Sequence, residues 1–562
     1  MKQVLVLCSA VLCALVLAIV GTTPPFPRGQ DTPAEAFSAE RAMVHVKRIA
    51  RRPHPSGSAE IAQVRAWLGA QLREQGLVVR EQAGAFDDLG RQHLDARAGL
   101  ERADIPLINV IAQLPGRDPS LPGVALMAHY DSVEGSPGAA DDGAGVATIL
   151  ETVRALKAGP APARSLYVLL TDGEEAGLRG ARMFFEAAPE AERIGAIINL
   201  EARGGGGVAR MFQTSRDNGE VARLWAKAAP HPGGDSLSTF IYAFLPNDTD
   251  LTVALERDYA AWNFAFIGRP ELYHSPQATA DNLDRGALQQ MGGQTLGLTR
   301  ALLGAEHLPQ PAPGRVFFDV FGLFVLDYAP VWGWVMLVLA VAGGGLALAG
   351  RVEGRAALGG LVRMLVLLVG SALVFTGLNM LSVSGEGANY YDRLAAIPRL
   401  QAMVALAAVA LAVATFGRKP RGVSGDVGAM VPILLLGCAA QALAPVAAYP
   451  LTIPLMLTGL AAGLRRFVPA GLALVVDGVV AAVSLGYGLT LGFLLMQGVG
   501  PDMPGAVALP LGVAVMTLLP LRPNPLSRGS LAICVTCLLT AALAVAAWVR
   551  FDEMAATIAT YS

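Results

Sequence analysis

Hydrophobic runs dominate the second half of the chain. They lie near residues 330–349, 360–380, 396–416, 427–446, 449–464, 470–496, 504–521 and 530–549. A helix needs about 20 apolar residues to cross the hydrocarbon core of a bilayer, and every run except the short one at 449–464 approaches or exceeds that length. Another run follows Lys2 and extends to about Val20. The pattern therefore predicts nine membrane-spanning helices in contact with a lipid bilayer.

The region between these runs alternates short apolar segments with helix-like stretches. LINVIAQL, GVALMAHYDS, SLYVLLTDGEE and IGAIINLEARG have the length and composition of buried strands. GVATILETVRALKAG and ARMFFEAA lie between them and are interpreted as helices. Apolar strands that alternate with helices predict an α/β fold, with a mixed, largely parallel sheet sandwiched by helices. The membrane region that follows is predicted to be an all-α polytopic domain.

These patterns divide the chain into five parts. We expect an N-terminal membrane anchor over 1–22, an α/β domain over 30–308, a linker over 309–328, a membrane domain of about eight helices over 329–550 and a tail over 551–562. The first segment also has the length of a cleaved signal peptide, although its cleavage signature is poor. Either form would export the α/β domain.

The composition of the chain supports this division. Hydrophobic residues make up 53% of the chain and charged residues only 16%, against about 25% in a typical soluble protein. All seven histidines precede residue 310, whereas the five cysteines lie in apolar runs. Cys534 and Cys537 form a CxxC pair without a histidine nearby and are interpreted as packing residues. The net charge of −2 gives no electrostatic reason to expect a nucleic-acid partner.

The loops between the apolar runs differ in their basic residues. Because basic loops stay on the cytoplasmic side, we expect a cytoplasmic N-terminus and place residues 25–325 in the periplasm or outside the cell, at a bacterial inner or plasma membrane. Asp477 lies inside a run without an apparent basic partner, which favours a structural role for it. The loops expected inside carry Arg351 and Arg355, then Arg418, Lys419 and Arg421, then Arg465 and Arg466, then Arg522 and Arg528.

Polar side chains gather where the predicted strands end. His129 and Asp131 follow the strand VALMA, and at this spacing both side chains face the same way, so that Asp131 can orient the imidazole. Glu174 and Glu175 end the strand YVLLTDGEE, beside Asp172. Neighbouring ionised carboxylates repel one another unless a cation is present. This cluster therefore suggests a metal site.

Further candidate ligands follow at the same edge of the sheet. Asp141 and Asp142 in GAADDGAG precede a helix, for which they could also serve as a cap. Glu201 ends the strand IINLEA, and His274 lies in ELYHSPQATADNLD. Mixed histidine and carboxylate ligands suit zinc, and their number suits two zinc ions that share a carboxylate.

The order and context of these motifs resemble metallopeptidase family twenty-eight, the co-catalytic zinc aminopeptidases. HYDS, GAADDGAG, TDGEEAGLRGA, NLEARG and YHSPQATADNLD carry the resemblance, which covers roughly residues 35–305. PHPSGS, NLEARG, PNDTDLTVA and NFAFIG are most similar to the membrane-bound branch typified by the endoplasmic reticulum metallopeptidase (Fxna type). The resemblance implies a zinc exopeptidase fold of the phosphorylase/hydrolase-like type. It also implies a membrane-bound aminopeptidase that removes N-terminal residues from peptides.

The resemblance further implies which residues hold the metal. Asp141 would bridge two zinc ions. His129 and Glu201 would complete the site of one ion, and Glu175 and His274 the site of the other.

The remaining roles are also implied by the resemblance. Glu174 would be the general base, which takes a proton from water and delivers it to the leaving amine. Asp131 would be the carboxylate partner of His129, and Asp142 would be joined to Asp141 through a cis peptide bond. The residues expected to support the metal site or a substrate loop are Asp142, Arg203, Asp250 and Tyr273.

Two positions depart from the family pattern. Glu201 stands where many relatives have Asp, although the membrane-bound branch has Glu there. Ala278 replaces the usual acid of the motif that contains His274, and because that acid is not a ligand we expect altered support of the loop. His54 in PHPSGS is interpreted as fixing a loop rather than binding metal.

Three alternatives to a zinc aminopeptidase are open. A glutaminyl cyclase shares the fold and the HYDS and DGEE motifs, but it uses one zinc and typically lacks the Asp141–Asp142 pair. A non-catalytic, receptor-like ectodomain has lost its metal ligands, whereas all five are present here. In the third alternative the C-terminal helices form a transporter with an accessory peptidase, and the scarcity of buried charge argues against it.

Overall fold

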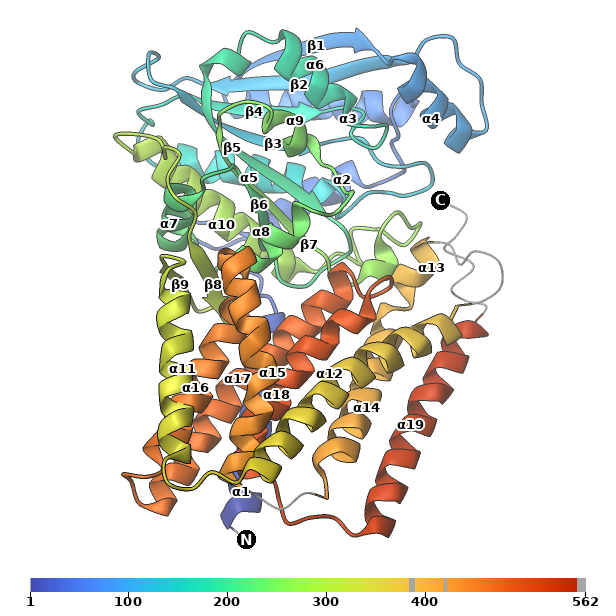
Figure 1. Ribbon diagram of the computed structural model, residues 1–562. Coiled ribbons are helices and arrows are strands. Elements are labelled where there is room, and N and C mark those ends of the chain that lie inside the picture. The colour runs from blue at the N-terminus through green and yellow to red at the C-terminus, as the bar shows by residue number, and fades with distance from the viewer. Residues whose placement is uncertain (1, 384–389, 419–421, 553–562) are drawn as a thin grey trace. The chain divides into compact units, whose positions relative to one another are not determined.

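The chain divides into two compact units in the computed structural model, which describes residues 2–383, 390–418 and 422–552 (Figure 1). One unit comprises Thr23–Asp327, and the other comprises the N-terminal helix together with the described residues between Tyr328 and Asp552. Lys419 and Arg421 of the predicted basic loops, and the predicted tail from residue 553, lie outside the described residues.

The unit Thr23–Asp327 is built on a seven-stranded sheet. Pairing is parallel between β4, β3, β5 and β7 at its centre and antiparallel between the outer neighbours β1–β2, β2–β4 and β6–β7. The predicted α/β fold with a mixed sheet is confirmed, and parallel pairing is confined to the central strands. The strand order is β1 (Val78–Ala85), β2 (Pro106–Leu114), β4 (Leu166–Thr171), β3 (Gly123–His129), β5 (Ile194–Ala202), β7 (Ala260–Phe266) and β6 (Arg210–Thr214).

Helices cover both faces of this sheet, because side chains alternate between the faces along each strand. In β3, Val124 and Leu126 enter the larger core, whereas Ala125 and Met127 enter the smaller core on the opposite face. The larger core lies against α2 (Ala39–Ile49), α3 (Ala59–Glu74), α5 (Gly143–Lys157) and α10 (Arg285–Gly304), and the smaller against α6 (Arg179–Ala187) and α9 (Asp250–Ala254). The sandwich leaves the carboxyl edge of the parallel strands for the functional groups.

The remaining helices of this unit lie in the connections between strands. Helix α4 (Asp88–Ala98) occupies the connection between β1 and β2. The connections around β6 contain α7 (Gly219–Ala228) and α8 (Ser236–Tyr242), and η1 (Ala191–Arg193) and η2 (Pro270–Leu272) are short 3₁₀ turns.

The segment expected as a linker is instead part of the folded unit. Strands β8 (Val316–Val320) and β9 (Phe324–Tyr328) form a hairpin. The ring of Phe317 is fully buried, and its centroid lies 5.9 Å from that of Trp225. Asp319 of β8 accepts from Nη2 of Arg210 at 3.0 Å. The prediction of a linker over 309–328 is therefore wrong for the hairpin, because VFFDV supplies large apolar side chains that complete the core.

The second unit is a bundle of apolar helices. Within the described residues, seven helical stretches are long and apolar enough to cross a membrane by length and composition: α1 (Lys2–Thr22), α12 (Gly354–Leu381), α14 (Ile397–Phe416), α15 (Val423–Leu443), α17 (Ala470–Gly498), the stretch Pro504–Leu521 that contains α18 (Ala508–Leu518), and α19 (Arg528–Arg550). Two shorter apolar helices, α11 (Trp332–Leu348) and α16 (Tyr449–Leu464), fill the other two predicted positions. The short helix α13 (Tyr390–Ala395) precedes α14.

Helix α1 packs along α17 as a member of this bundle. Ala14 is fully buried, and a Cβ atom on Gly486 would lie 3.2 Å from the carbonyl oxygen of Ala14. Ala10 belongs to the same small cluster as Ala481. These contacts give the N-terminal segment a packing partner, and its retention as a membrane anchor stays a prediction.

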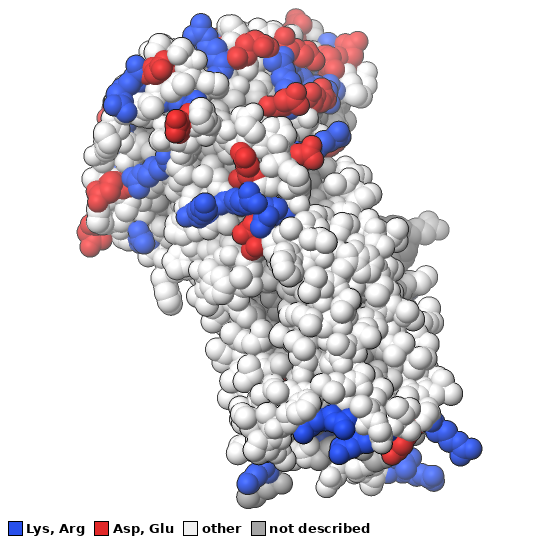
Figure 2. Space-filling view, turned by 60° about the vertical axis from the view of Figure 1, so that its left-hand side comes forward, with Lys and Arg blue, Asp and Glu red and all other residues white. Residues whose placement is uncertain are grey.

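The basic loops meet at one end of the bundle. The backbone N–H of Glu353 donates to Oγ of Ser424 at 3.0 Å, and Nη1 of Arg466 donates to the carbonyl of Leu346 at 2.9 Å. The amide of Gln3 lies 3.5 Å from the carbonyl of Pro520, which places the N-terminal end of α1 there too. Figure 2 shows lysine and arginine side chains at this lower end, below a surface without charged residues.

Asp477 has a basic partner in the structure. Nη2 and Nε of Arg465 lie 2.7 and 3.2 Å from its Oδ1 atom. Arg465 directly follows α16, and the turn into α17 brings the guanidinium back beside the second turn of that helix. The expectation that Asp477 lacks a partner is therefore wrong, because the pair forms across a turn rather than within one apolar run.

Candidate metal centre

The predicted site residues meet at the carboxyl edge of the parallel strands. His129 ends β3 and is paired in register with Thr171, the last residue of β4, so the turn that carries Glu174 and Glu175 lies beside it. Glu201 lies near the end of β5, on the other side of β3. The loop after β7 brings His274 to the same edge, as expected for functional groups of an open α/β sheet.

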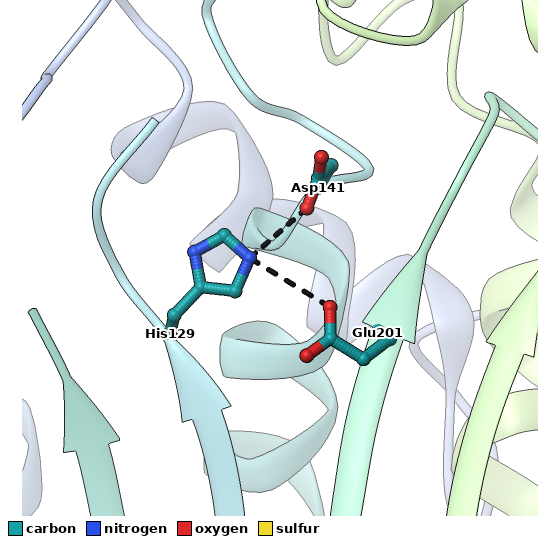
Figure 3. A group of neighbouring side chains, drawn as sticks. All are labelled: His129, Asp141 and Glu201. Atoms are coloured by element: carbon teal, nitrogen blue, oxygen red, sulfur yellow. Dashed lines mark hydrogen bonds and ion pairs between the residues drawn. The ribbon is translucent and has the colours of Figure 1, made fainter. Parts of the chain in front are cut away.

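Asp141 lies between the two histidines. Its Oδ1 atom is 3.0 Å from Nε2 of His129, and its Oδ2 atom is 3.2 Å from Nε2 of His274. Nε2 of His129 is also 3.8 Å from Oε2 of Glu201, and Figure 3 shows these three side chains converging. Oε1 of Glu175 lies 2.9 Å from Nε2 of His274. The two oxygens of Asp141 therefore face two separate groups of donors.

These donors form overlapping groups suited to metal ions. His129, Asp141 and Glu201 place one ligand atom each within 4.8 Å of one another, and so do Asp141, Glu175 and His274. A third group joins His129 with Glu174 and Glu175. Mixed imidazole and carboxylate ligands are those that zinc takes in proteins, so the residues present fit the zinc implied by the fold family.

The electrostatics of the site also call for a cation. Burial raises the pKa of Glu201 to about 8, with Asp141 and Asp250 adding to the increase. Burial, together with the charges of Glu201 and Glu175, raises the pKa of Glu174 well above its ordinary value. Several buried carboxylates thus share a small volume with two imidazoles, and a bound cation would relieve their repulsion.

Asp131 orders the site through both its backbone and its side chain. Nδ1 of His129 lies 3.0 Å from the main-chain carbonyl of Asp131 and 3.4 Å from its Oδ1 atom. The carboxylate accepts the backbone N–H groups of Glu174 and Glu175 at 3.2 and 3.3 Å. Asp131 therefore holds an imidazole on one side and the two-glutamate turn on the other.

Asp142 and Asp250 lie around the donor groups. Asp142 caps α5 by accepting from the backbone N–H of Gly145 at 3.0 Å, and its peptide bond to Asp141 is cis. Asp250 accepts a hydrogen bond from the hydroxyl of Thr171, at the end of β4, and burial raises its pKa to about 6. The helix-cap interpretation of Asp142 is therefore correct.

The other predicted residues take supporting positions. The rings of Tyr273 and His274 stack with centroids 3.8 Å apart, which fixes the plane of the imidazole. The backbone N–H of Arg203 donates to the carbonyl of Phe266 at 3.0 Å and ties the glycine run after β5 to β7. The carbonyl of Ala278 accepts from the N–H of Ala139 at 3.0 Å, so a backbone hydrogen bond joins the His274 loop to the Asp141 loop.

The motif around His54 is explained by loop contacts. Its Nδ1 atom lies 2.9 Å from the carbonyl of Arg52, and its backbone N–H donates to Oγ of Ser132 at 3.0 Å. Ser56, from the same motif, donates to Oδ1 of Asp172 at 2.6 Å, and Oδ2 of Asp172 accepts the N–H of Ile108 at 3.0 Å. Sequence analysis missed this role of Ser56, although its place in the PHPSGS motif was a usable signal.

Comparison with known proteins places this site in a family. Residues 109–299 match Peptidase family M28, and this stretch contains every donor described above. The chain is 32% identical over 327 residues to endoplasmic reticulum metallopeptidase 1 of Rattus norvegicus, covering 54% of this chain and 36% of that protein. It is 30% identical over 317 residues to the vacuolar membrane protease of Eremothecium gossypii, covering 53% and 31%.

Residues 109–299 therefore form a Peptidase family M28 domain, and the similarity to these membrane relatives supports the membrane-bound branch, which confirms the predicted resemblance. It is a multi-pass membrane protein with a metallopeptidase domain. The chain spans about a third of the length of these curated relatives.

Two solved structures are also similar to part of the chain. One is BSAP, a zinc aminopeptidase from Bacillus subtilis, at 16% identity over 51% of this chain and 100% of that chain, with a TM-score of 0.39. The other is a Porphyromonas gingivalis glutaminyl cyclase, at 21% identity over 47% and 98%, with a TM-score of 0.38.

Proposed function

We propose that this protein is a membrane-bound exopeptidase that uses two zinc ions and acts as an aminopeptidase on peptides. The observation that carries the proposal is the position of Asp141, whose two carboxylate oxygens face His129 and His274 separately. With Glu201 on one side and Glu175 on the other, each group has its own imidazole and its own carboxylate. A shared carboxylate between two such groups is the arrangement of a two-metal hydrolase.

The roles of the side chains follow from their places around the donors. Bound zinc would lower the pKa of a water molecule and polarise the scissile carbonyl group. Glu174 lies beside the ligand Glu175, and its backbone is fixed by Asp131. Its carboxylate would accept a proton from the water as the carbonyl carbon is attacked. It would then return the proton to the amine nitrogen as the C–N bond breaks.

A single-zinc glutaminyl cyclase is the competing interpretation. Glutaminyl cyclases use one zinc ion and typically lack an adjacent pair of aspartates such as Asp141 and Asp142. Here both oxygens of Asp141 face imidazoles, which favours two ions.

We further propose that the N-terminus is cytoplasmic and the peptidase domain lies on the opposite side of the membrane, because the basic loops share one end of the bundle.

The test is hydrolysis by the purified full-length protein after loading with zinc. Fluorogenic substrates with a free N-terminal residue should be cleaved, and the same substrates with an acetylated N-terminus should not. Conversion of N-terminal glutamine to pyroglutamate without peptide-bond cleavage would identify a cyclase instead.

A further inference from the structure

A small hydrophobic cluster attaches helix α4 to the turn that carries the two glutamates. Leu94 of α4 is buried with Phe86, Ile105 and Leu107 against Ala176. Ala176 directly follows Glu175 in the chain. The helix that connects β1 and β2 is therefore packed beside the candidate metal centre.

Polar contacts hold both ends of α4 in this position. Asp87 caps the helix by accepting from the N–H of Gly90 at 2.8 Å, and its other oxygen lies 3.0 Å from Nη1 of Arg179. Asp95 pairs with Arg102 at 2.7 Å in the loop that follows. The carboxylates of α4 and its flanking residues are therefore paired with groups other than Arg97, and these contacts hold the helix in place.

Arg97 extends from α4 to the turn that carries the two glutamates. It lies one turn after Leu94, on the same side of the helix, and its Nη1 atom donates to the main-chain carbonyl of Glu175 at 3.2 Å. Among the described residues, Arg97 makes this one hydrogen bond and has no carboxylate within ion-pair distance. Its guanidinium is half-buried and has donors to spare.

The neighbouring His93 is a titratable group and not a permanent cation. Burial, together with the guanidinium groups of Arg97 and Arg179, lowers its pKa below the ordinary value for histidine. Arg179 is paired with Asp87, so its charge is already compensated. Arg97 is therefore the permanent cation beside this turn that can bind a ligand carboxylate.

We propose that Arg97 binds a carboxylate of the substrate and directs this enzyme to peptides with a negative charge close to the scissile bond. The proposal rests on the proposed aminopeptidase function. Guanidinium and carboxylate groups form paired, charge-assisted hydrogen bonds, which makes an arginine beside a hydrolytic centre a selective feature. Two sources share this chemistry: the C-terminal carboxylate of a short peptide and the side chain of an acidic residue.

Distance limits how far the carboxylate can be from the reacting bond. Arg97 contacts the backbone of Glu175, whose side chain lies 2.9 Å from His274. An extended peptide advances at most about 3.3–3.6 Å per residue, so a substrate carboxylate within roughly two residues of the scissile bond can reach the guanidinium. Long neutral peptides would gain nothing from Arg97.

The experiment compares matched substrates on the zinc-loaded, full-length protein. Leu-Gly is compared with Leu-Gly-amide for the C-terminal carboxylate, and Leu-Asp-amide with Leu-Asn-amide for the side chain. We expect kcat/KM to favour the charged member of at least one pair by about tenfold or more, the usual size for a hydrogen bond to a charged group. Arg97→Gln should reduce that ratio to near one, and Arg97→Lys should keep part of it.

Arg91→Gln is the matched control. Arg91 is in the same helix and carries the same charge, but it pairs with the exposed Asp88 and donates to the carbonyl of Ala103. This variant should keep the ratio of the unmodified protein. Which of the two substrate pairs responds identifies the source of the carboxylate.

Failure of this inference differs from failure of the proposed function. Cleavage without preference for charge, or a preference that Arg97→Gln leaves unchanged, would overturn the role of Arg97 alone. If none of the four substrates is cleaved, calorimetric binding of D-Leu-Gly and its amide decides the matter. Tighter binding of the acid that is lost in Arg97→Gln supports the inference, and equal binding overturns it.

Discussion

The side chain of Asp131 is joined to the backbone of Glu174: the N–H of Glu174 donates to Oδ1 of Asp131 at 3.2 Å. The other carboxylate oxygen accepts the N–H of Glu175 at 3.3 Å, and the carbonyl of the same aspartate faces His129. Asp131, two residues beyond the end of β3, thus sets the position of the proposed general base and of proposed ligands on both sides of Asp141.

Asp131→Asn should therefore impair metal binding and catalysis together. An amide of the same size keeps one acceptor but turns an NH₂ group toward the second N–H. We expect kcat/KM and zinc affinity to fall by about 10–100-fold, the usual effect of removing a partner that orients metal ligands. Kinetics and zinc retention against graded chelator would measure this. Asp88→Asn, at an exposed position of α4, is the control, and equal behaviour of the two variants would contradict the role of Asp131.

Glu174→Gln should separate proton transfer from metal binding. The amide keeps the shape of the side chain but cannot accept the proton of water. Hydrolysis should fall by about 10²–10⁴-fold, the usual contribution of general acid–base catalysis, while bound zinc stays at the level of the unmodified protein. Elemental analysis and steady-state kinetics on the same samples provide the measurement.

Glu175→Gln is expected to act in the opposite way. Oε1 of Glu175 lies 2.9 Å from Nε2 of His274, so the variant should weaken one zinc site and recover part of its activity at high zinc. Loss of zinc in Glu174→Gln but not in Glu175→Gln would reverse the two assignments. Full activity in both variants would place the site elsewhere.

Two zinc ions per chain are expected in the active protein. Removal with a chelator should abolish hydrolysis. Titration with zinc should restore it in two stages, because Glu201 of one donor group is buried whereas Glu175 of the other is partly exposed. Elemental analysis of the reconstituted protein would give the stoichiometry. One tightly held ion, with no gain of activity on adding more, would favour the cyclase.

Reporter fusions should give opposite results at Ser215 and Gly422. Gly422 lies before α15, in a loop at the end of the bundle that gathers the basic residues, and Ser215 lies in the α/β unit after β6. The positive-inside pattern predicts that a fusion at Gly422 is cytoplasmic and one at Ser215 is not. A phosphatase and a fluorescent-protein reporter, each active on one side only, would measure this. Matching results at both positions would overturn the proposed orientation.

The ion pair between Arg465 and Asp477 should stabilise the helical bundle. Asp477→Asn removes the charge that compensates a partly buried guanidinium, and we expect a loss of about 1–3 kcal/mol in unfolding free energy. Thermal unfolding in detergent would show a lower midpoint. Arg465→Gln should behave alike, and the double variant should cost less than the sum of the two. Additive losses would mean that the pair is not coupled.

The convergence of the candidate metal ligands could be predicted from the sequence because these residues lie at strand ends. His129 and Glu201 directly end apolar runs, and parallel pairing brings such ends to one edge. Arg97 could not be found in this way, because its place depends on how α4 packs through Leu94 against Ala176. Nothing in the local pattern around Arg97 indicates that contact.

The apolar helices could also be predicted from the sequence, since length and apolarity suffice to identify them. The partner of Asp477 could not be predicted, because an ion pair across the α16–α17 turn depends on the geometry of that turn. The hairpin of β8 and β9 was missed for a related reason. Its short apolar strands lie directly before a membrane helix and were interpreted as a linker, although they complete the core around Trp225.

The hairpin of β8 and β9 limits where the chain can be cut without damage to the α/β unit. A soluble fragment that ends at residue 308 would lose Phe317 from beside Trp225 and expose a large apolar ring to water. It would also leave Arg210 with Asp235 but without Asp319. Release of the intact α/β unit from the bundle would therefore require cleavage close to residue 328, beyond β9, together with a second cleavage just after α1. Cleavage nearer α10 would yield a fragment prone to aggregate.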